Sequence, residues 1–281
     1  MPAERFSTRL AQRIARFSPL CIGIDPSAQS LKQCGLPDNA EGALAFAERI
    51  LQAADFELAI VKPQSAYFER YGSMGMQAME ELARLVRARE VLFLLDAKRG
   101  DIDTTGLAYA EAYFSDKSSL RADALTLHAY LGFAALEPAI DFAVKQGGGL
   151  FPVVRSSNPE GESLQNARLP DDRTVAEALC DAINALNNRY DPEALGPVGA
   201  VVGATCEDAE AITQRLAQSF VLAPGVGAQG ATMQDVRNRM PSARGRVLPS
   251  VSRAILKNGP KTDDIRVAIR ALREDAQKHL G

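Results

Sequence analysis

The feature that most constrains the fold is a repeated alternation of short apolar runs and longer helical stretches. Eight runs rich in aliphatic and β-branched residues lie at 20–24, 58–61, 91–95, 124–127, 150–154, 198–202, 220–223 and 247–251. Stretches with the 3.6-residue period of an amphipathic helix lie between them, among them 43–53, 76–88, 174–187 and 207–218. A strand followed by a helix, repeated along the chain, predicts parallel strand pairing.

The apolar runs are continuous rather than alternating, which is typical of strands covered on both faces. Eight strand–helix units in about 250 residues are the content of a closed (β/α)8 barrel, the TIM barrel. A doubly wound open α/β sheet is the alternative. No Ser-, Gly- or Pro-rich linker divides the chain, so we expect residues 1–281 to form a single domain. Segment 155–173 resembles an insertion and is expected to form a loop over the functional site.

The N-terminal segment can form a helix with one apolar face, made of Phe6, Leu10, Ile14 and Phe17. Arginines occupy other positions around it, so a helix on a membrane surface is one possible interpretation. The polar face also carries acidic and uncharged residues, which is typical of a solvated surface. We therefore expect this helix to pack on the barrel.

Composition excludes several classes of partner and location. The net charge is -3 with acids and bases interspersed, so neither nucleic acid nor an anionic membrane is indicated as a partner. No uncharged run reaches transmembrane length, and the start lacks the apolar stretch of a secretion signal. The cysteines are widely spaced and predict neither a disulfide framework nor a zinc site; a reducing cytoplasm is the expected location. They are Cys21, Cys34, Cys180 and Cys206.

Charged residues stand at the ends of several predicted strands. Asp25 follows the first run, Lys62 ends the second, Asp96 and Lys98 end the third, and Arg253 follows the eighth. The carboxyl ends of barrel strands meet at one mouth, so these groups are expected to converge. Asp96 and Lys98 are two residues apart and should point to the same side of a strand. One such pair could be a structural ion pair, but a buried cluster is costly to desolvate and indicates a functional site.

A glycine-rich segment follows the seventh run. Gly225, Gly227 and Gly230 match the dinucleotide pattern G-x-G-x-x-G, but they do not follow the first strand, and no acidic residue follows the next strand. In a barrel, the loops after strands seven and eight commonly bind phosphate through backbone N–H groups. We expect Gln229 and Arg253 to complete a phosphate site, although the glycines could serve only as turns.

Two further features carry less information. The segment RSSNPEG at 155–161 could be a simple turn, but at a barrel mouth Ser157 could hydrogen-bond a planar heterocycle. His128 ends the fourth run, and the other histidine, His279, lies at the C-terminus, so no histidine-based metal site can be built. No strained G-x-S-x-G turn indicates a nucleophilic serine.

The run DAKRGDI at 96–102 resembles the D-x-K-x-x-D signature of the orotidine 5'-phosphate decarboxylase superfamily. The order of the other motifs agrees from residue 20 to residue 255. The sequences of the RSSNPEG and DAKRGD motifs are most similar to those of the longer bacterial branch of the family. The resemblance implies a cofactor-free enzyme that converts orotidine 5'-phosphate (OMP) to uridine 5'-phosphate (UMP), the last step of de novo pyrimidine synthesis.

The resemblance also implies a role for each matching residue. Asp25 would bind a ribose hydroxyl, and Lys62 would contact the ribose and hold the carboxylates in place. Asp96 would lie beside the substrate carboxylate, and Lys98 would protonate C6 after CO2 leaves.

The remaining implied contacts concern a second subunit, the base and the phosphate. A homodimer partner would supply Asp101 and Thr105 to the site. Ser157 would contact the pyrimidine, and the phosphate would be held by Gln229, Ser252 and Arg253.

Three alternatives stay open at this point. A metal-dependent sugar-phosphate decarboxylase of the same superfamily would carry a carboxylate at the position of Lys62 to bind Mg²⁺. An aldolase could use Lys98 as a Schiff-base nucleophile, although acidic neighbours would hold that amine protonated. A non-catalytic sensor of phosphate ligands would need the phosphate loop but not the charged cluster.

Overall fold

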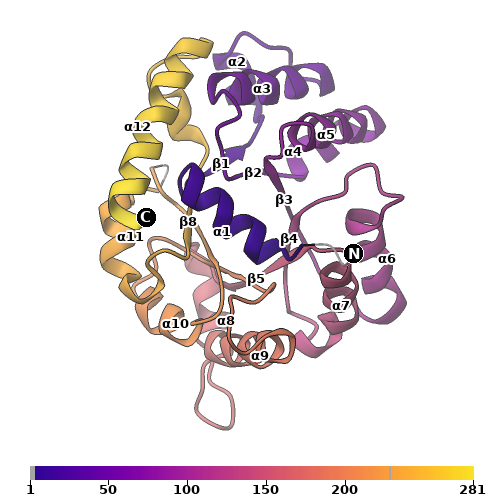
Figure 1. Cartoon of the computed structure of the whole chain (residues 1–281), viewed down its shortest axis with the longest axis vertical. Helices are drawn as coiled ribbons and strands as arrows, with labels where there is room; N and C mark the ends of the chain where they lie inside the picture. The colour runs from indigo at the N-terminus through magenta and orange to yellow at the C-terminus, as the bar shows by residue number, and fades with distance from the viewer. Residues whose placement is uncertain (1–3, 228) are drawn as a thin grey trace.

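Eight parallel strands close into a barrel in chain order, with β8 completing the ring beside β1 (Figure 1). The computed structural model describes residues 4–227 and 229–281. The predicted closed barrel is confirmed, and the open doubly wound sheet is wrong. The strands are β1 (Cys21–Ile24), β2 (Ile60–Pro63), β3 (Leu92–Arg99), β4 (Ala124–Leu127), β5 (Gly149–Arg155), β6 (Ala200–Val202), β7 (Val221–Pro224) and β8 (Val247–Val251).

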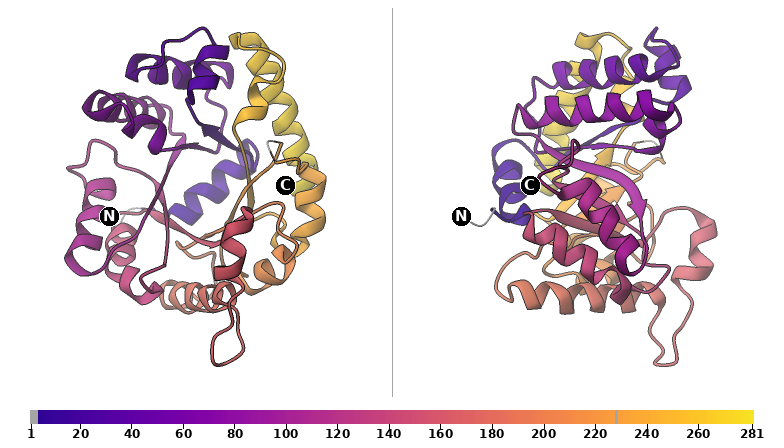
Figure 2. Two further views of the ribbon diagram at one scale, coloured as in Figure 1. Left: turned by 180° about the vertical axis from the view of Figure 1, so that it is seen from behind. Right: turned by 90° about the vertical axis from the view of Figure 1, so that its right-hand side faces the viewer.

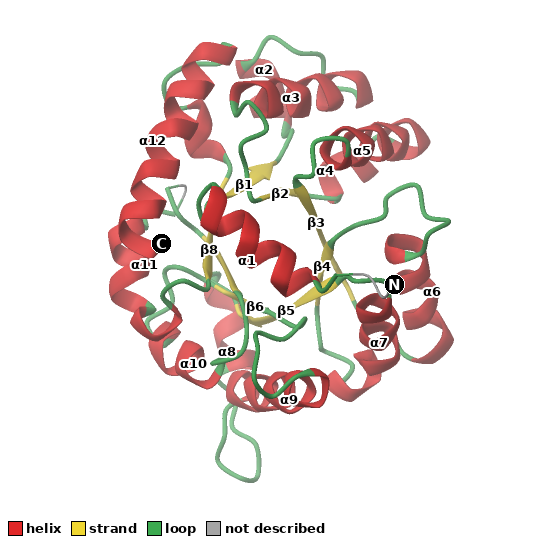
Figure 3. Cartoon of the chain, viewed as in Figure 1, coloured by secondary structure: helices red, strands yellow, loops and turns green. Residues whose placement is uncertain are grey.

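At least one helix lies between every two consecutive strands, and the helices form a ring outside the barrel (Figure 3). The α-helices are α1 (Phe6–Arg16), α2 (Ala28–Gln33), α3 (Ala40–Ala53), α4 (Ala66–Glu69), α5 (Gly72–Arg87), α6 (Asp103–Phe114), α7 (Glu137–Lys145), α8 (Glu162–Gln165), α9 (Val175–Tyr190), α10 (Ala209–Arg215), α11 (Met233–Arg239) and α12 (Thr262–Leu280). Within residues 4–227 and 229–281, the 3₁₀ segments are η1 (Phe133–Leu136), η2 (Pro159–Gly161), η3 (Pro241–Ala243) and η4 (Arg253–Leu256). None of the described helices is long and apolar enough to cross a membrane.

Some strands extend beyond the apolar runs that predicted them, and two of these extensions carry charged residues of the predicted site. β2 includes Lys62, and β3 continues through Asp96 and Lys98 to Arg99. Apolar content marks where a strand is covered on both faces, but a strand can continue with polar residues where it reaches the mouth of a barrel. The charged residues therefore lie within the strands and are held by the sheet.

Helix α1 closes the amino-terminal end of the barrel. Phe6, Leu10 and Ile14 are buried against the strand residues at that end. Figure 2 (right) shows α1 at one end of the molecule and the insertion after β5 at the other. Phe17 departs from the predicted apolar face: it follows the last turn of α1, is half-buried, and lies beneath the Arg13 and Arg16 guanidinium groups.

Phe6→Ala should destabilise the barrel without changing its chemistry. The Phe6 ring is 2% exposed and meets Phe151 edge to face at 5.9 Å. Removing a buried phenyl group typically costs about 3–5 kcal/mol of unfolding free energy. Urea unfolding measures this loss, with Phe17→Ala as a half-buried control that should cost less. Equal losses for the two variants would contradict the proposed packing of α1.

The insertion after β5 contains more structure than a loop. It forms η2 and α8, and a bridge between Arg168 and Thr174 then closes a turn ahead of α9. This turn projects beyond the ring of helices (Figure 2). The insertion lies at the carboxyl end of the barrel, which is the end that carries the charged strand residues.

Candidate active site

The structure joins three of the predicted site residues in one ion cluster at the barrel mouth. Lys62 Nζ donates to Asp96 Oδ2 at 2.9 Å, and Lys98 Nζ donates to Asp96 Oδ1 at 2.6 Å. The neighbouring strands β2 and β3 supply these groups. A single carboxylate is therefore held between two ammonium groups.

The two lysines differ in their exposure. The side chains of Lys62 and Asp96 are 7% and 9% exposed, whereas that of Lys98 is 48% exposed. Lys62 and Asp96 thus form the floor of the site, and Lys98 stands at its open side. A ligand entering the mouth would meet the Lys98 ammonium group directly.

The buried pair Lys62 and Asp96 is charged throughout the neutral pH range. Burial alone lowers the pKa of Lys62, but the negative charges of Asp96 and Asp25 outweigh burial and raise it above the ordinary lysine value. Burial alone raises the pKa of Asp96, but the charges of Lys62 and Lys98 outweigh it and hold the pKa well below the ordinary range. Asp96 is therefore an anion when a substrate arrives.

Thr126 belongs to the same cluster and was missed by the sequence analysis. It is fully buried in β4. Its hydroxyl donates to Asp96 Oδ1 at 2.9 Å and accepts the Lys98 backbone N–H at 2.9 Å. The signal that could have identified it is a single polar residue in the otherwise apolar run ALTL. A hydroxyl in such a position needs a partner, because burying it unpaired is costly.

The backbone at Lys98 is strained. Its φ is 45°, in the left-handed region, and the pairing of β3 with β4 is irregular between Leu95 and Arg99. For a residue other than glycine this conformation costs roughly 1–2 kcal/mol. The prediction that Asp96 and Lys98 point the same way assumed a regular strand; in the structure they meet across an irregular one. Such strain is common at functional sites.

Asp25 directly follows β1 and lies close enough to Lys62 to affect its pKa. Its Oδ1 is buried and has no hydrogen-bond partner among the described residues. Buried polar atoms are normally paired, so this oxygen is available to a ligand hydroxyl or water.

Asp101 and Thr105 lie apart from the cluster within this chain. Asp101 Oδ1 accepts the backbone N–H of Ile102 at 2.8 Å, and Thr105 is exposed in the first turn of α6. No hydrogen bond or ion pair joins Asp101 to Lys98 among the described residues of one chain.

Ser157 stands where the insertion leaves β5. A Cβ added to Gly203, which follows β6, would come within 2.9 Å of the Ser157 backbone nitrogen. The preceding Arg155 is 6% exposed, and its Nε donates to Asp208 at 2.9 Å. Gln165 of α8 accepts the Ser156 backbone N–H at 2.9 Å. These contacts fix the segment that presents Ser157, and the sequence analysis gave Arg155 no role.

The predicted phosphate residues lie on neighbouring loops. Gly225, Gly227 and Gly230 all have positive φ, as glycine permits, and Ala228 between them lies outside the described residues. A Cβ on Gly225 would lie 2.6 Å from Gln229 Oε1, so Gln229 folds back over this turn.

Arg253 begins η4 and is exposed, and it lines one surface hollow together with Gly227. Ser252 packs against β1, since a Cβ on Gly23 would lie 2.7 Å from the Ser252 Cβ. The segment after β8 therefore adjoins the strand that precedes Asp25.

His128 follows β4 and is half-buried. It packs against the turn after Lys98: a Cβ on Gly100 would lie 2.4 Å from the His128 carbonyl oxygen. The contact gives His128 a structural role.

Comparison with known proteins adds to this geometry. Residues 18–267 match the family model described as "Orotidine 5'-phosphate decarboxylase / HUMPS family". The chain belongs to this family. The predicted resemblance to orotidine 5'-phosphate decarboxylases is thereby confirmed.

Individual members of the orotidine 5'-phosphate decarboxylase family match nearly end to end. The orotidine 5'-phosphate decarboxylase of Myxococcus xanthus is 45% identical over 278 residues, covering 99% of this chain and 94% of the relative. That of Salinispora arenicola is 43% identical and covers 99% of each chain.

Solved structures of the family agree with the fold. A crystal structure from Streptomyces avermitilis has a TM-score of 0.92 at 40% identity, covering 100% of this chain and 97% of the other. The OMP decarboxylase of Leishmania donovani has a TM-score of 0.80 at 30% identity, covering 98% of each chain.

Proposed function

We propose that this chain is a carboxy-lyase that converts OMP to UMP, the last step of de novo pyrimidine synthesis. The observation that carries the proposal is Asp96 held between Lys62 and Lys98 at the barrel mouth. Relatives that match this chain nearly end to end are named orotidine 5'-phosphate decarboxylase.

The chemistry requires such a cluster. Loss of CO2 leaves a carbanion at C6 of the pyrimidine, and the ring delocalises that charge poorly. A fixed ammonium group can stabilise the carbanion and then protonate it. Lys98 is the half-exposed lysine of the cluster and fills this role. Its Nζ is held by Asp96 at 2.6 Å, and charge stabilisation by this fixed group takes the place of a cofactor acting as an electron sink.

Asp96 has a second role in the proposal. It is anionic, and its place beside the substrate carboxylate sets two like charges together. That repulsion is relieved when CO2 departs, so it favours the transition state over the bound substrate. Lys62, paired with the other Asp96 oxygen, keeps the carboxylate in place and contacts the ribose together with Asp25.

Remote groups bind the rest of the nucleotide. We assign the pyrimidine contact to Ser157 and the phosphate contacts to Gln229, Ser252 and Arg253. Phosphate binding provides interaction energy away from the reacting carbon, which can be used to orient the base.

Arg253→Ala should weaken substrate binding more than it slows the chemical step. A hydrogen bond to a charged group is worth about 1.5–3 kcal/mol, so we expect KM for OMP to rise roughly ten- to a hundredfold. Steady-state kinetics measure this change, with Arg237→Ala, an exposed arginine of α11, as the control. An unchanged KM would remove Arg253 from the phosphate site.

Thr126→Val should slow turnover and also lower the free energy of unfolding. The substitution keeps the side-chain volume but removes both hydrogen bonds that link Asp96 to the Lys98 backbone. Loss of a buried hydrogen-bond partner costs about 1–3 kcal/mol of unfolding free energy. Because the same bonds position Lys98, and small displacements of a catalytic group slow the reaction strongly, we expect kcat to fall about tenfold or more. Thr213→Val is the matched control, because Thr213 is also fully buried but lies in α10. Equal kcat values in the two variants would contradict this assignment.

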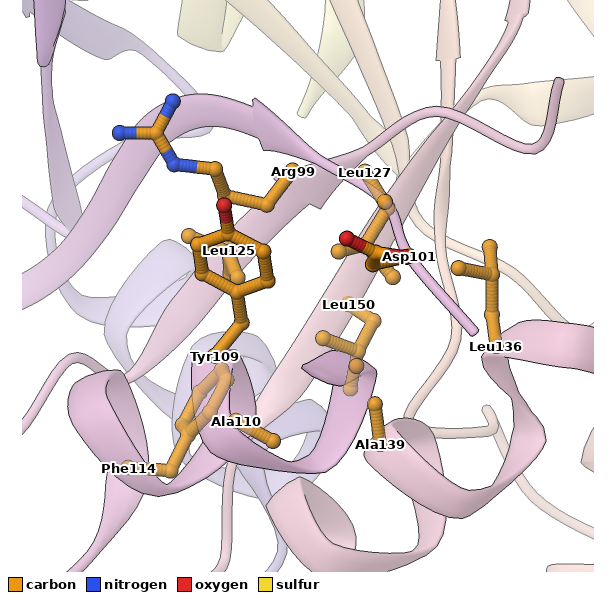
Figure 4. Close-up of a pocket in the computed structure, with 12 residues that line it drawn as sticks. Arg99, Asp101, Tyr109, Ala110, Phe114, Leu125, Leu127, Leu136, Ala139 and Leu150 are labelled. Atoms are coloured by element: carbon orange, nitrogen blue, oxygen red, sulfur yellow. The ribbon is translucent and has the colours of Figure 1, made fainter. Parts of the chain in front are cut away.

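The active form in this proposal is a homodimer that receives Asp101 and Thr105 from the partner subunit. The exposed large apolar residues around the Asp101 loop support it. Ile102, Tyr109 and Tyr130 are 47%, 38% and 77% exposed, and they are costly to leave in water. An apolar pocket also lies behind Asp101 (Figure 4).

We also propose that a single barrel domain, closed at its amino-terminal end by α1, carries the whole function. We further propose that the enzyme works in the cytoplasm. All four cysteines are free and buried, which suits a reducing compartment.

The experiment that tests the function follows the ultraviolet absorbance of OMP with purified protein treated with a chelator. We expect full turnover in EDTA. Abolition by EDTA would favour the metal-dependent sugar-phosphate decarboxylase, and trapping of an adduct with borohydride would favour the Schiff-base aldolase. Binding without turnover would favour the sensor.

A further inference from the structure

Arg99 follows Lys98 directly, but its side chain does not enter the barrel mouth. Its Nε donates to the Tyr113 hydroxyl at 3.0 Å, and its Nη2 donates to Glu69. These partners lie on α6 and α4, outside the strands. The Arg99 side chain is 30% exposed, so the network is only partly open to solvent.

The contact with Glu69 leads back to the ion cluster. Glu69 also accepts a hydrogen bond from the Ser65 hydroxyl, and the Ser65 backbone N–H donates to the Asp96 carbonyl oxygen at 3.1 Å. Ser65 is buried and lies three residues after Lys62. Arg99 therefore ties the end of β3 to the segment that follows β2, and these are the two strands that carry the lysines.

The contact with Tyr113 leads toward Asp101. Tyr113 is buried in α6, a helix that begins two residues after Asp101. On the other side of the turn, the Arg99 carbonyl oxygen accepts the His128 N–H at 3.0 Å. Figure 4 shows Arg99 and Asp101 leaving the chain in different directions, with Tyr109 beside Arg99. The turn from Lys98 to Asp101 is thus fixed on both sides.

We propose that Arg99 is a positioning residue. Its hydrogen bonds to Glu69 and Tyr113 hold Lys98 in its strained backbone conformation and fix the orientation of the Asp101 turn. A non-glycine residue at a φ of 45° keeps that conformation only when its surroundings enforce it. The inference rests on the proposed function, because Lys98 is the proton donor there. Arg99 should therefore affect kcat rather than nucleotide binding, because the groups proposed to bind the base and the phosphate lie at the ends of other strands.

The test compares Arg99→Leu, Glu69→Gln and Tyr113→Phe with the wild type. We expect Arg99→Leu to lower kcat roughly ten- to a hundredfold, because small displacements of a catalytic group have effects of this size. Its Kd for UMP should stay within about threefold of the wild-type value, because hydrogen bonds to the nucleotide are unchanged in number. Arg84→Leu is the control, since it removes an arginine ion pair of the same charge type that lies within the single helix α5 and is exposed.

A double variant tests whether the network acts as a unit. Residues in one network have non-additive effects, so Arg99→Leu with Glu69→Gln should have nearly the same kcat as Arg99→Leu alone. Additive losses would overturn the proposal, as would an unchanged kcat or a UMP affinity that falls in parallel with kcat. If thermal unfolding shows that Arg99→Leu does not fold, Tyr113→Phe takes its place in the test. Its kcat should then fall while its affinity for UMP stays close to the wild-type value. Absence of OMP turnover in the wild type would instead reject the proposed function.

Discussion

Lys98→Ala should reduce kcat for OMP by at least roughly four orders of magnitude while leaving a site that still binds UMP. General acid catalysis contributes about 10²–10⁴-fold, and electrostatic stabilisation of developing charge a further 10²–10³-fold for one group. Lys98 is the half-exposed ammonium of the cluster and would supply both effects. Single-turnover kinetics and UMP titration measure the two quantities separately.

The appropriate control is Lys117→Ala, which removes an exposed lysine between α6 and β4. Its kcat should equal that of the wild type. Lys98→Arg keeps a positive charge but changes the position and acidity of the donor, so it should also be severely impaired. Normal turnover by Lys98→Ala would reject Lys98 as the proton donor and with it the mechanism.

The barrel could be predicted because its signals are local and repeated. Each strand from β1 to β8 overlaps a continuous apolar run, and the helices between them show helical periodicity. The charges at the mouth followed from one topological rule, that strand ends meet. Asp25, Lys62 and Asp96 could therefore be predicted from the sequence alone to lie near one another.

Other parts of the site depend on geometry that no local pattern encodes. The left-handed backbone at Lys98 and the register shift before Arg99 arise where β3 and β4 meet at the mouth. Thr126 became recognisable only when its hydroxyl was found between Asp96 and Lys98. The long side chain of Arg99 reaches α4 and α6, and spacing in the sequence could not show that these helices lie within its reach.

The role of Asp101 cannot be read from the contacts within one chain. Asp101 stands three residues after Lys98, yet no hydrogen bond or ion pair joins the two among the described residues of one chain. The proposed mechanism therefore assigns Asp101 to the site of a second copy of the chain. A twofold axis near this loop would place Asp101 of each subunit at the site of the other.

Mixing two inactive variants, Lys98→Ala and Asp101→Ala, should restore activity. In a mixed dimer, one site combines both defects, whereas the other combines an intact Lys98 with an intact Asp101 from the opposite subunit. Random reassociation of equal amounts forms about half mixed dimers, each with one working site, so about a quarter of wild-type activity should return. Steady-state assays after co-refolding measure it, and native mass spectrometry counts the mixed dimers.

The decisive control mixes Lys98→Ala with Lys62→Ala. Both lysines bind the same Asp96 within one chain, so every site of this mixed dimer lacks one of them, and no activity should return. Recovery in the first mixture but not in the second can arise only if Asp101 crosses the interface while the two lysines do not. If mixed dimers of Lys98→Ala and Asp101→Ala form and remain inactive, Asp101 acts within its own chain, and the shared-site proposal is wrong.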